Sequence, residues 1–171
     1  HKLYDADFVM RWTNLPYLVD VETKMTLRAE EGKDGAPDAY MVWDKKTNSA
    51  QPLPYPWNDG LDPALEGEYV VDGRVCKTGW QLLRERCEEF TLEKAAEICQ
   101  VDRDKIEEAI RVFTDNTPSG LCLGVATDQT PNSVQAAMAA CTIDLLMGNV
   151  ERPGALLQRF RTSGCFDMPN Y

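Results

Sequence analysis

The residues most suited to chemistry lie in one polar turn, Thr127-Asp128-Gln129-Thr130-Pro131-Asn132-Ser133. The turn follows an apolar stretch and precedes a helical pattern, and Gly124 would let a ligand approach the backbone closely. In open α/β sheets, ligands bind beyond the carboxyl ends of the strands, where a helix N-terminus offers N–H groups. The turn therefore predicts a site for a phosphate-bearing cofactor, with amide contacts from Gln129 and Asn132.

The same residues have a simpler interpretation as the start of a helix. Thr130 can cap a helix whose first residue is Pro131, and every strand–helix unit needs such a start. Asp128 would repel a phosphate, although its carboxylate could accept hydrogen bonds from a guanine or pterin edge. The residues alone favour the plain helix start and leave the cofactor site open.

Composition narrows the classes of protein to which the chain could belong. Its 171 residues correspond to about one domain. Acidic residues outnumber basic ones by 28 to 18, and the net charge of −10 argues against nucleic acid as a partner. The charge also argues mildly against an anionic ligand, unless a wider site supplies cations. No apolar run approaches the roughly 20 residues that span a bilayer, so direct membrane insertion is not expected.

Histidine and cysteine usage excludes several kinds of site. The only histidine is His1, so histidine-dependent triads and histidine-rich metal sites are excluded. The six cysteines form no C-x-x-C pair, which excludes zinc ribbons and the local part of an iron–sulfur motif. Cys87, Cys99 and Cys141 occupy apolar positions of expected helices and Cys122 an apolar strand, so we expect small buried side chains. A bridging or reactive role is the alternative.

Residues 1–75 read as a loop-rich region that carries a helix and short strands. The patterns predict a helix over 3–12, a β-hairpin over 17–28 and a strand over 40–43. Four prolines between 51 and 63 favour extended irregular chain. A further strand and turn are expected over 68–73.

Residues 76–171 change character and read as an α/β region. Three short helices are expected over 78–89, 92–99 and 102–113. The continuous apolar run 121–126 predicts a buried parallel strand, and a long helix follows the polar turn and ends at Gly148. Arg152 would meet the dipole of that helix or reach a cofactor phosphate. The predicted fold class is therefore α/β, a fragment of a Rossmann-like cofactor-binding domain with a loop-rich β-hairpin insertion.

Seven motifs in order resemble the interior of one enzyme family, the molybdopterin-guanine-dinucleotide oxidoreductases of the dimethyl sulfoxide reductase superfamily. The matching stretches are 3–8, 12–19, 40–44, 67–77, 90–98, 124–129 and 145–154. The resemblance implies an internal fragment of a larger catalytic subunit in which two α/β domains clasp two pterin-guanine dinucleotides that hold one molybdenum or tungsten. The family's contact turn maps onto Gly124, Val125, Thr127, Asp128 and Gln129, and Gln129 is the position we favour most.

The resemblance also implies parts that these residues do not supply. A 4Fe-4S cluster, the protein ligand of the metal and an iron–sulfur electron-transfer subunit would lie elsewhere, and the parent enzyme would be cytoplasmic or exported to the bacterial periplasm or cell surface. Formate dehydrogenases carry Arg-Gly-x-Asn-Asn where this chain reads Arg161-Thr162-Ser163-Gly164-Cys165, so only the arginine matches. The turn itself is closer to the acetylene hydratase, thiosulfate or polysulfide reductase and catechol dehydroxylase branches. The alternatives from other classes are an α/β binding or interaction module with no redox role and a thiol-based redox protein.

Overall fold

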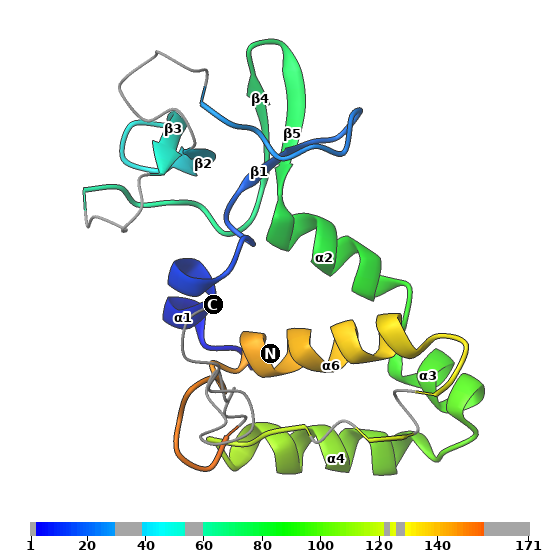
Figure 1. Ribbon diagram of the computed structural model, residues 1–171. Coiled ribbons are helices and arrows are strands. Elements are labelled where there is room, and N and C mark those ends of the chain that lie inside the picture. Colours follow the sequence, from blue (N-terminus) through cyan, green and yellow to red (C-terminus); the bar gives the residue numbers. More distant parts are fainter. Residues whose placement is uncertain (1–2, 30–38, 54–59, 122–123, 126–128, 156–171) are drawn as a thin grey trace, which may run out of the picture. The chain divides into compact units, whose positions relative to one another are not determined.

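The computed structural model describes residues 3–29, 39–53, 60–121, 124–125 and 129–155 (Figure 1). The chain forms two compact units, one of residues 7–107 and one of residues 1–6 together with 108–171. Both helices and small antiparallel sheets are present, which confirms the mixed α/β class. The boundary expected after residue 75 stays a prediction.

A three-stranded antiparallel sheet lies at the centre of the first unit. Its order is β1 (Leu18–Asp20), β5 (Arg74–Thr78) and β4 (Glu68–Val71). β4 and β5 form a hairpin whose turn, Asp72-Gly73, has φ of 48° and 78°, as a type I′ turn requires. The strand and turn expected over 68–73 are therefore confirmed, whereas β5 was not foreseen.

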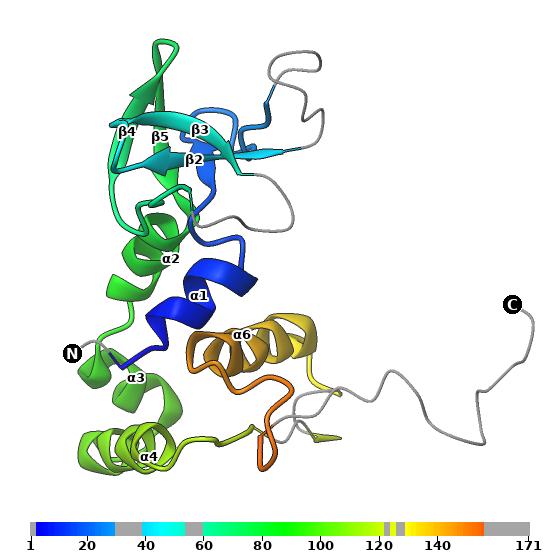
Figure 2. The same cartoon turned by 90° about the vertical axis from the view of Figure 1, so that its left-hand side faces the viewer.

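A second hairpin lies beside this sheet and pairs β2 (Tyr40–Asp44) with β3 (Ser49–Leu53) (Figure 2). The strand expected at 40–43 is confirmed. The expectation of irregular chain over 51–63 is wrong at 51–53, because Pro52 pairs with Met41 inside β3, whereas residues 60–63 belong to no named helix or strand. A two-stranded sheet has only edge strands, where a proline need not interrupt a ladder of hydrogen bonds.

The hairpin expected over 17–28 is confirmed, and it contributes to the core of the first unit. The Leu27 N–H donates to the Leu18 carbonyl at 2.8 Å. Leu18, Leu27 and Cys76 form the buried cluster, and Trp43 packs against it while it stacks on Tyr69 with ring centroids 4.3 Å apart. These contacts bring the two sheets into one packed unit.

The expected helices are confirmed as α1 (Ala6–Trp12), α2 (Gly79–Glu88), α3 (Leu92–Cys99) and α4 (Arg103–Asp115). Thr78 and Thr91 cap α2 and α3, because their side chains accept hydrogen bonds from Gln81 N–H and Lys94 N–H. None of the described residues of α2, α3 or α4 is fully buried.

The cysteines on the helices correct one expectation. Cys87, Cys99 and Cys141 are exposed free thiols, so their predicted burial is wrong, whereas Cys76 is buried. The apolar positions around them are also exposed, Ile98 at 61% for example, because no other part of the described chain covers these helix faces. Cys122 and Cys165 lie outside the described residues.

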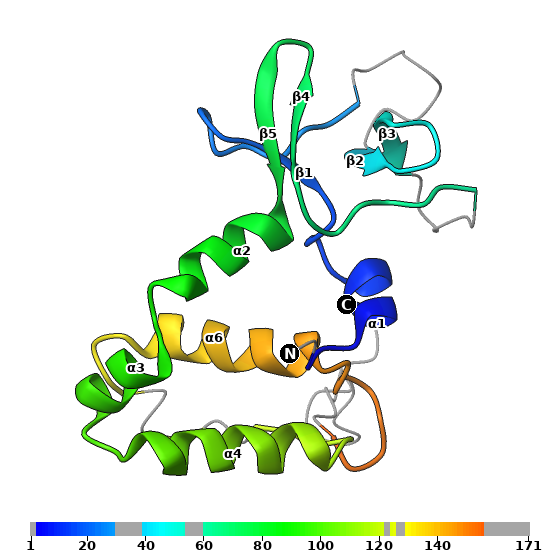
Figure 3. The same cartoon turned by 180° about the vertical axis from the view of Figure 1, so that it is seen from behind.

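The long helix of the second unit, α6 (Ser133–Leu146), is confirmed but begins later than expected (Figure 3). Asn132, rather than Thr130, is its N-cap residue. In the described part of 121–126, neither Leu121 nor Gly124 lies in a strand and Val125 has helical backbone. The sheets seen in the described ranges are antiparallel, so the Rossmann-like arrangement stays a prediction.

Candidate functional site

The structure places the described residues of the predicted site on one exposed loop ahead of α6. Gly124, Val125, Gln129 and Asn132 are all exposed, Val125 at 67%. The Gln129 N–H donates to the Val125 carbonyl at 3.0 Å, which brings the two ends of the 125–129 segment together. Thr127 and Asp128 lie outside the described residues.

The start of α6 differs from the starts of α2 and α3. Thr78 and Thr91 each use a side-chain oxygen to cap their helix, whereas the Asn132 side chain makes no cap hydrogen bond. The Asn132 amide is therefore exposed to solvent without serving the helix. A Cβ added at Gly124 would meet no described atom within 4 Å.

The other end of α6 closes with a Schellman motif. The Asn149 N–H donates to the Asp144 carbonyl at 2.8 Å and the Gly148 N–H to the Leu145 carbonyl at 3.2 Å. Gly148 has φ of +63°, the left-handed conformation that this motif needs at its glycine position. The predicted end of the helix at Gly148 is confirmed.

Two buried polar side chains of this motif hold the segment that leads to the exposed loop. Asn149 is fully buried, and its Oδ1 accepts from the Ser119 N–H at 3.2 Å while its Nδ2 donates to Ser119 Oγ at 2.8 Å. Asp144 is 2% exposed, and its carboxylate accepts from the Leu121 N–H. Burial raises the pKa of the Asp144 carboxyl, and the Leu121 hydrogen bond offsets part of that shift.

Sequence reasoning missed both of these side chains. One signal was available, because Asp144 is the single charged residue among the 14 residues of α6. A lone carboxylate in an otherwise uncharged helix is typical of a buried polar contact rather than of a solvated face. Asn149 carried no comparable signal beyond its place directly after a helix-ending glycine.

Arg152 pairs with the N-terminal segment of the same unit. Its Nη2 lies 3.2 Å from Asp5 Oδ2, and the Asp5 N–H donates to the Leu146 carbonyl at 2.8 Å. The residue thus neutralises a carboxylate beside the C-terminal end of α6. Its expected reach to a cofactor phosphate stays a prediction.

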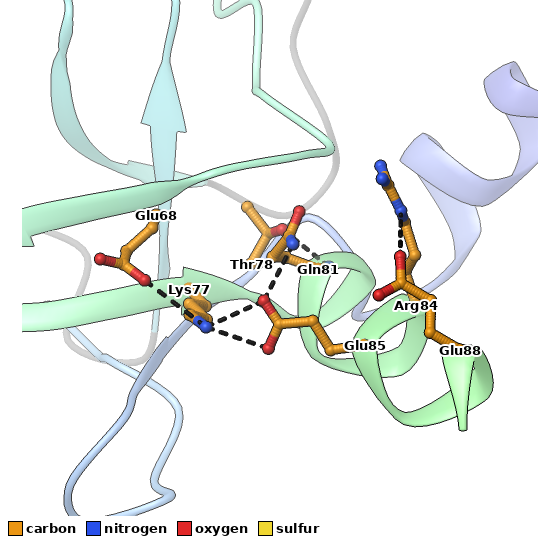
Figure 4. Close-up of polar contacts among 7 residues, drawn as sticks. All are labelled: Glu68, Lys77, Thr78, Gln81, Arg84, Glu85 and Glu88. Carbon is orange, nitrogen blue, oxygen red and sulfur yellow. Dashed lines mark hydrogen bonds and ion pairs between the residues drawn. The ribbon is translucent and has the colours of Figure 1, made fainter.

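Among the charged residues of α2, Glu85 is engaged in a network with residues of the neighbouring strands (Figure 4). Lys77 Nζ lies 2.8 Å from Glu85 Oε1 and 3.5 Å from Glu68 Oε2, and Gln81 Nε2 donates to Glu85 Oε1 at 2.9 Å. The hydrogen bond from Lys77, and then that from Gln81, lower the pKa of the Glu85 carboxyl. These groups satisfy one another and connect the strands to α2.

The described residues contain neither a metal-binding cluster nor a helix that could cross a membrane. Within those ranges, no group of three or more histidine, cysteine, aspartate or glutamate side chains could hold a metal ion. No described helix combines the length and the apolar character needed to cross a membrane. The exposed loop with its buried support is therefore the candidate site that the described chain offers.

Comparison with known proteins finds several larger oxidoreductases. The chain is 29% identical over 139 residues to dopamine dehydroxylase of Eggerthella lenta, which covers 74% of this chain and 14% of that protein. It is 25% identical over 164 residues to the alpha subunit of dimethylsulfide dehydrogenase from Rhodovulum sulfidophilum, covering 91% of this chain and 18% of that protein. A third relative is a sulfite dehydrogenase subunit from Allochromatium vinosum, 35% identical over 115 residues, or 61% of this chain and 11% of that protein.

These relatives confirm the resemblance drawn from the ordered motifs. The matches span less than a fifth of the length of each of these three proteins. No family model matches the chain.

Proposed function

We propose that this chain is an internal part of a catalytic subunit of the dimethyl sulfoxide reductase superfamily of molybdopterin oxidoreductases, and that its 124–132 loop helps to bind the pterin cofactor of that subunit. The cofactor, when bound, supplies the change of oxidation state that the reaction needs. The loop's own task is to bind and orient one end of that cofactor, which we propose is in the guanine dinucleotide form.

The observation that carries the proposal is the exposed pair of amides, Gln129 and Asn132, at a helix start that neither side chain caps. Each amide offers two donors and an acceptor, which suits the edge of a pterin or guanine ring. The first N–H groups of α6 carry a partial positive charge that favours a nearby phosphate. Gly124 has no Cβ, and no described atom lies within 4 Å of the place a Cβ would take, which leaves room beside its Cα.

We infer that the remaining parts of the enzyme come from elsewhere in the assembly. Several relatives are named as single subunits of their enzymes, which supports a catalytic subunit that works with partner subunits, and an iron–sulfur electron-transfer subunit is the kind we propose. The described residues offer no cluster of metal-binding side chains, so the ligands of molybdenum or tungsten and of a 4Fe-4S cluster would be supplied outside them.

The experiment compares two glutamines in the full-length catalytic subunit. Gln129→Ala removes the proposed amide contact, whereas Gln135→Ala removes an exposed amide of the same type inside α6 and serves as the matched control. The loss of one hydrogen bond of about 1 kcal/mol should weaken cofactor binding about fivefold in the first variant alone. Cofactor is measured as guanine nucleotide released by acid and as metal per protein molecule.

Equal cofactor content in both variants and the wild type would contradict the role of Gln129. The rival interpretation, a binding module with no redox role, predicts an active full-length protein without stoichiometric molybdenum or tungsten. Metal analysis of the purified protein therefore separates the two functions.

A further inference from the structure

We propose that Asp144 and Asn149 form a polar latch that positions the 119–121 segment, and through it the cofactor loop that begins at Gly124. The inference rests on the proposed function of that loop. Neither residue lies in the loop, so both are positioning residues rather than cofactor contacts.

The Schellman motif explains how two residues five apart come to act together. The motif brings together the third residue from the helix end, here Asp144, and the second residue beyond the cap, here Asn149, and this pair is commonly apolar. In this chain both side chains are polar and almost fully buried. Burial of a polar group is unfavourable unless hydrogen bonds compensate it, so the partners of these two side chains are where their role lies.

Those partners are two alternate residues of one segment. Asn149 holds both the N–H and the hydroxyl of Ser119, and Ser119 Oγ also donates to the Phe113 carbonyl at 3.1 Å. Asp144 holds the N–H of Leu121. The side chains of Asp144 and Asn149 thus bind the N–H groups of two alternate residues, the spacing at which a neighbouring strand binds its partner in a sheet.

The latch is close enough to the loop to set its position. Gly124 comes three residues after Leu121, and three residues span at most about 10 Å even when fully extended. The opposite end of the loop continues directly into α6, the helix that carries Asp144. The latch therefore ties the segment that precedes the loop to the same helix that follows it.

Asp144 places one of its two carboxylate oxygens against the Leu121 N–H, while the other is buried without a partner among the described residues. Asp144 Oδ1 has no hydrogen-bond partner in the part of the chain that the structure describes. The hydrogen bond from the Leu121 N–H is therefore the described contact that offsets the unfavourable burial of the Asp144 carboxylate. A residue that served only for packing would be apolar and would need no such bond.

The test uses the full-length catalytic subunit with four variants. Asp144→Leu removes the acceptor for Leu121 N–H, whereas Asp144→Asn retains an acceptor and should rescue. Gln129→Ala tests the loop itself. Thr142→Val is the matched control, because its hydroxyl binds only the Met138 carbonyl of its own helix among the contacts found, at 2.7 Å.

Two readouts are taken on each variant: hydrogen exchange at residues 119–121 and the amount of guanine nucleotide released by acid. We expect Asp144→Leu to raise exchange and weaken cofactor retention about fivefold each, the equivalent of one lost hydrogen bond. Asp144→Asn and Thr142→Val should show neither faster exchange nor a loss of cofactor relative to the wild type.

Other outcomes overturn the inference in distinguishable ways. Faster exchange in Asp144→Leu with full cofactor content, while Gln129→Ala loses cofactor, would refute the latch and leave the loop's function standing. Full content in both variants would refute the proposed function and the latch with it. If Asp144→Leu does not fold, Ser119→Ala decides, because it removes the hydroxyl held by Asn149; faster exchange without cofactor loss would again refute the latch.

Discussion

The two threonine N-caps of the first unit give a quantitative test of how burial changes the value of a cap. Thr78 is fully buried, and its hydroxyl accepts from the Gln81 N–H at 3.1 Å and donates to the Leu65 carbonyl at 2.7 Å. Thr91 is exposed; its hydroxyl accepts from the Lys94 N–H at 3.2 Å and also hydrogen-bonds the exposed Glu93 carboxylate. A Thr→Val change at either position keeps the side-chain shape and removes these hydrogen bonds.

The expected losses follow from the contacts. Removing an N-cap costs about 1 kcal/mol, and this is the effect expected for Thr91→Val, because its other contact, with Glu93, lies between two exposed side chains and contributes little. Thr78→Val also removes the bond to the Leu65 carbonyl, for about 1 kcal/mol more, so its free energy of unfolding should fall by about 2 kcal/mol. Both residues lie in the unit of residues 7–107, so one transition reports both changes.

Urea unfolding of the 171-residue chain, followed by tryptophan fluorescence and circular dichroism, measures the difference. The reasoning requires Thr78→Val to be the more destabilising by about 1 kcal/mol. Equal losses in the two variants would show that the buried contact with Leu65 contributes nothing, and the explanation based on burial would be refuted.

Two further predictions concern the second unit. Gly148→Ala should destabilise this unit by about 2 kcal/mol. About 1 kcal/mol comes from the strain of an alanine at φ +63°. The rest arises because the new Cβ would lie 2.8 Å from Asp5 Oδ2 and would break the ion pair between Asp5 and Arg152. Gly73 of the first unit serves for comparison, because it has a similar φ of +78° and an added Cβ would meet no atom within 4 Å, so Gly73→Ala should show only the backbone strain. Native-state hydrogen exchange measures the loss of stability in each variant, and equal losses would disprove the contact between the added Cβ and Asp5. Because burial raises the pKa of Asp144, the folded unit binds a proton more tightly than the unfolded chain, and this contribution to stability is lost as the pH rises through the raised pKa. The gain in stability of Asp144→Asn over the wild type should therefore be larger at pH 7 than at pH 4, as measured by hydrogen exchange. A difference in exchange rates that does not change with pH would contradict the raised pKa of Asp144.

Local patterns were sufficient for most of the elements. Threonine caps and helical spacing located α2 and α3, and Asp72-Gly73 located a tight turn, because each depends on neighbours in sequence. β5 was not foreseen, although it pairs with β4 across that same turn; its other partner, β1, lies more than 50 residues earlier.

Side-chain environments were less predictable than elements. Cys87 and Cys99 have the spacing of buried residues, yet both are exposed, because spacing shows which face is apolar but not whether anything covers it. Glu85 has the sequence context of a solvated residue, but the fold brings Lys77 within 2.8 Å of it.

By itself, the sequence determined the helices, the polar loop ahead of α6 and the family, since ordered short motifs persist without reference to packing. Only the tertiary structure decided that Asn132 leaves its helix uncapped and that Asp144 and Asn149 reach back to residues 119–121. The physical reason is distance along the chain: a contact between residues 23 or 30 positions apart is set by how the chain packs, and no local periodicity encodes it.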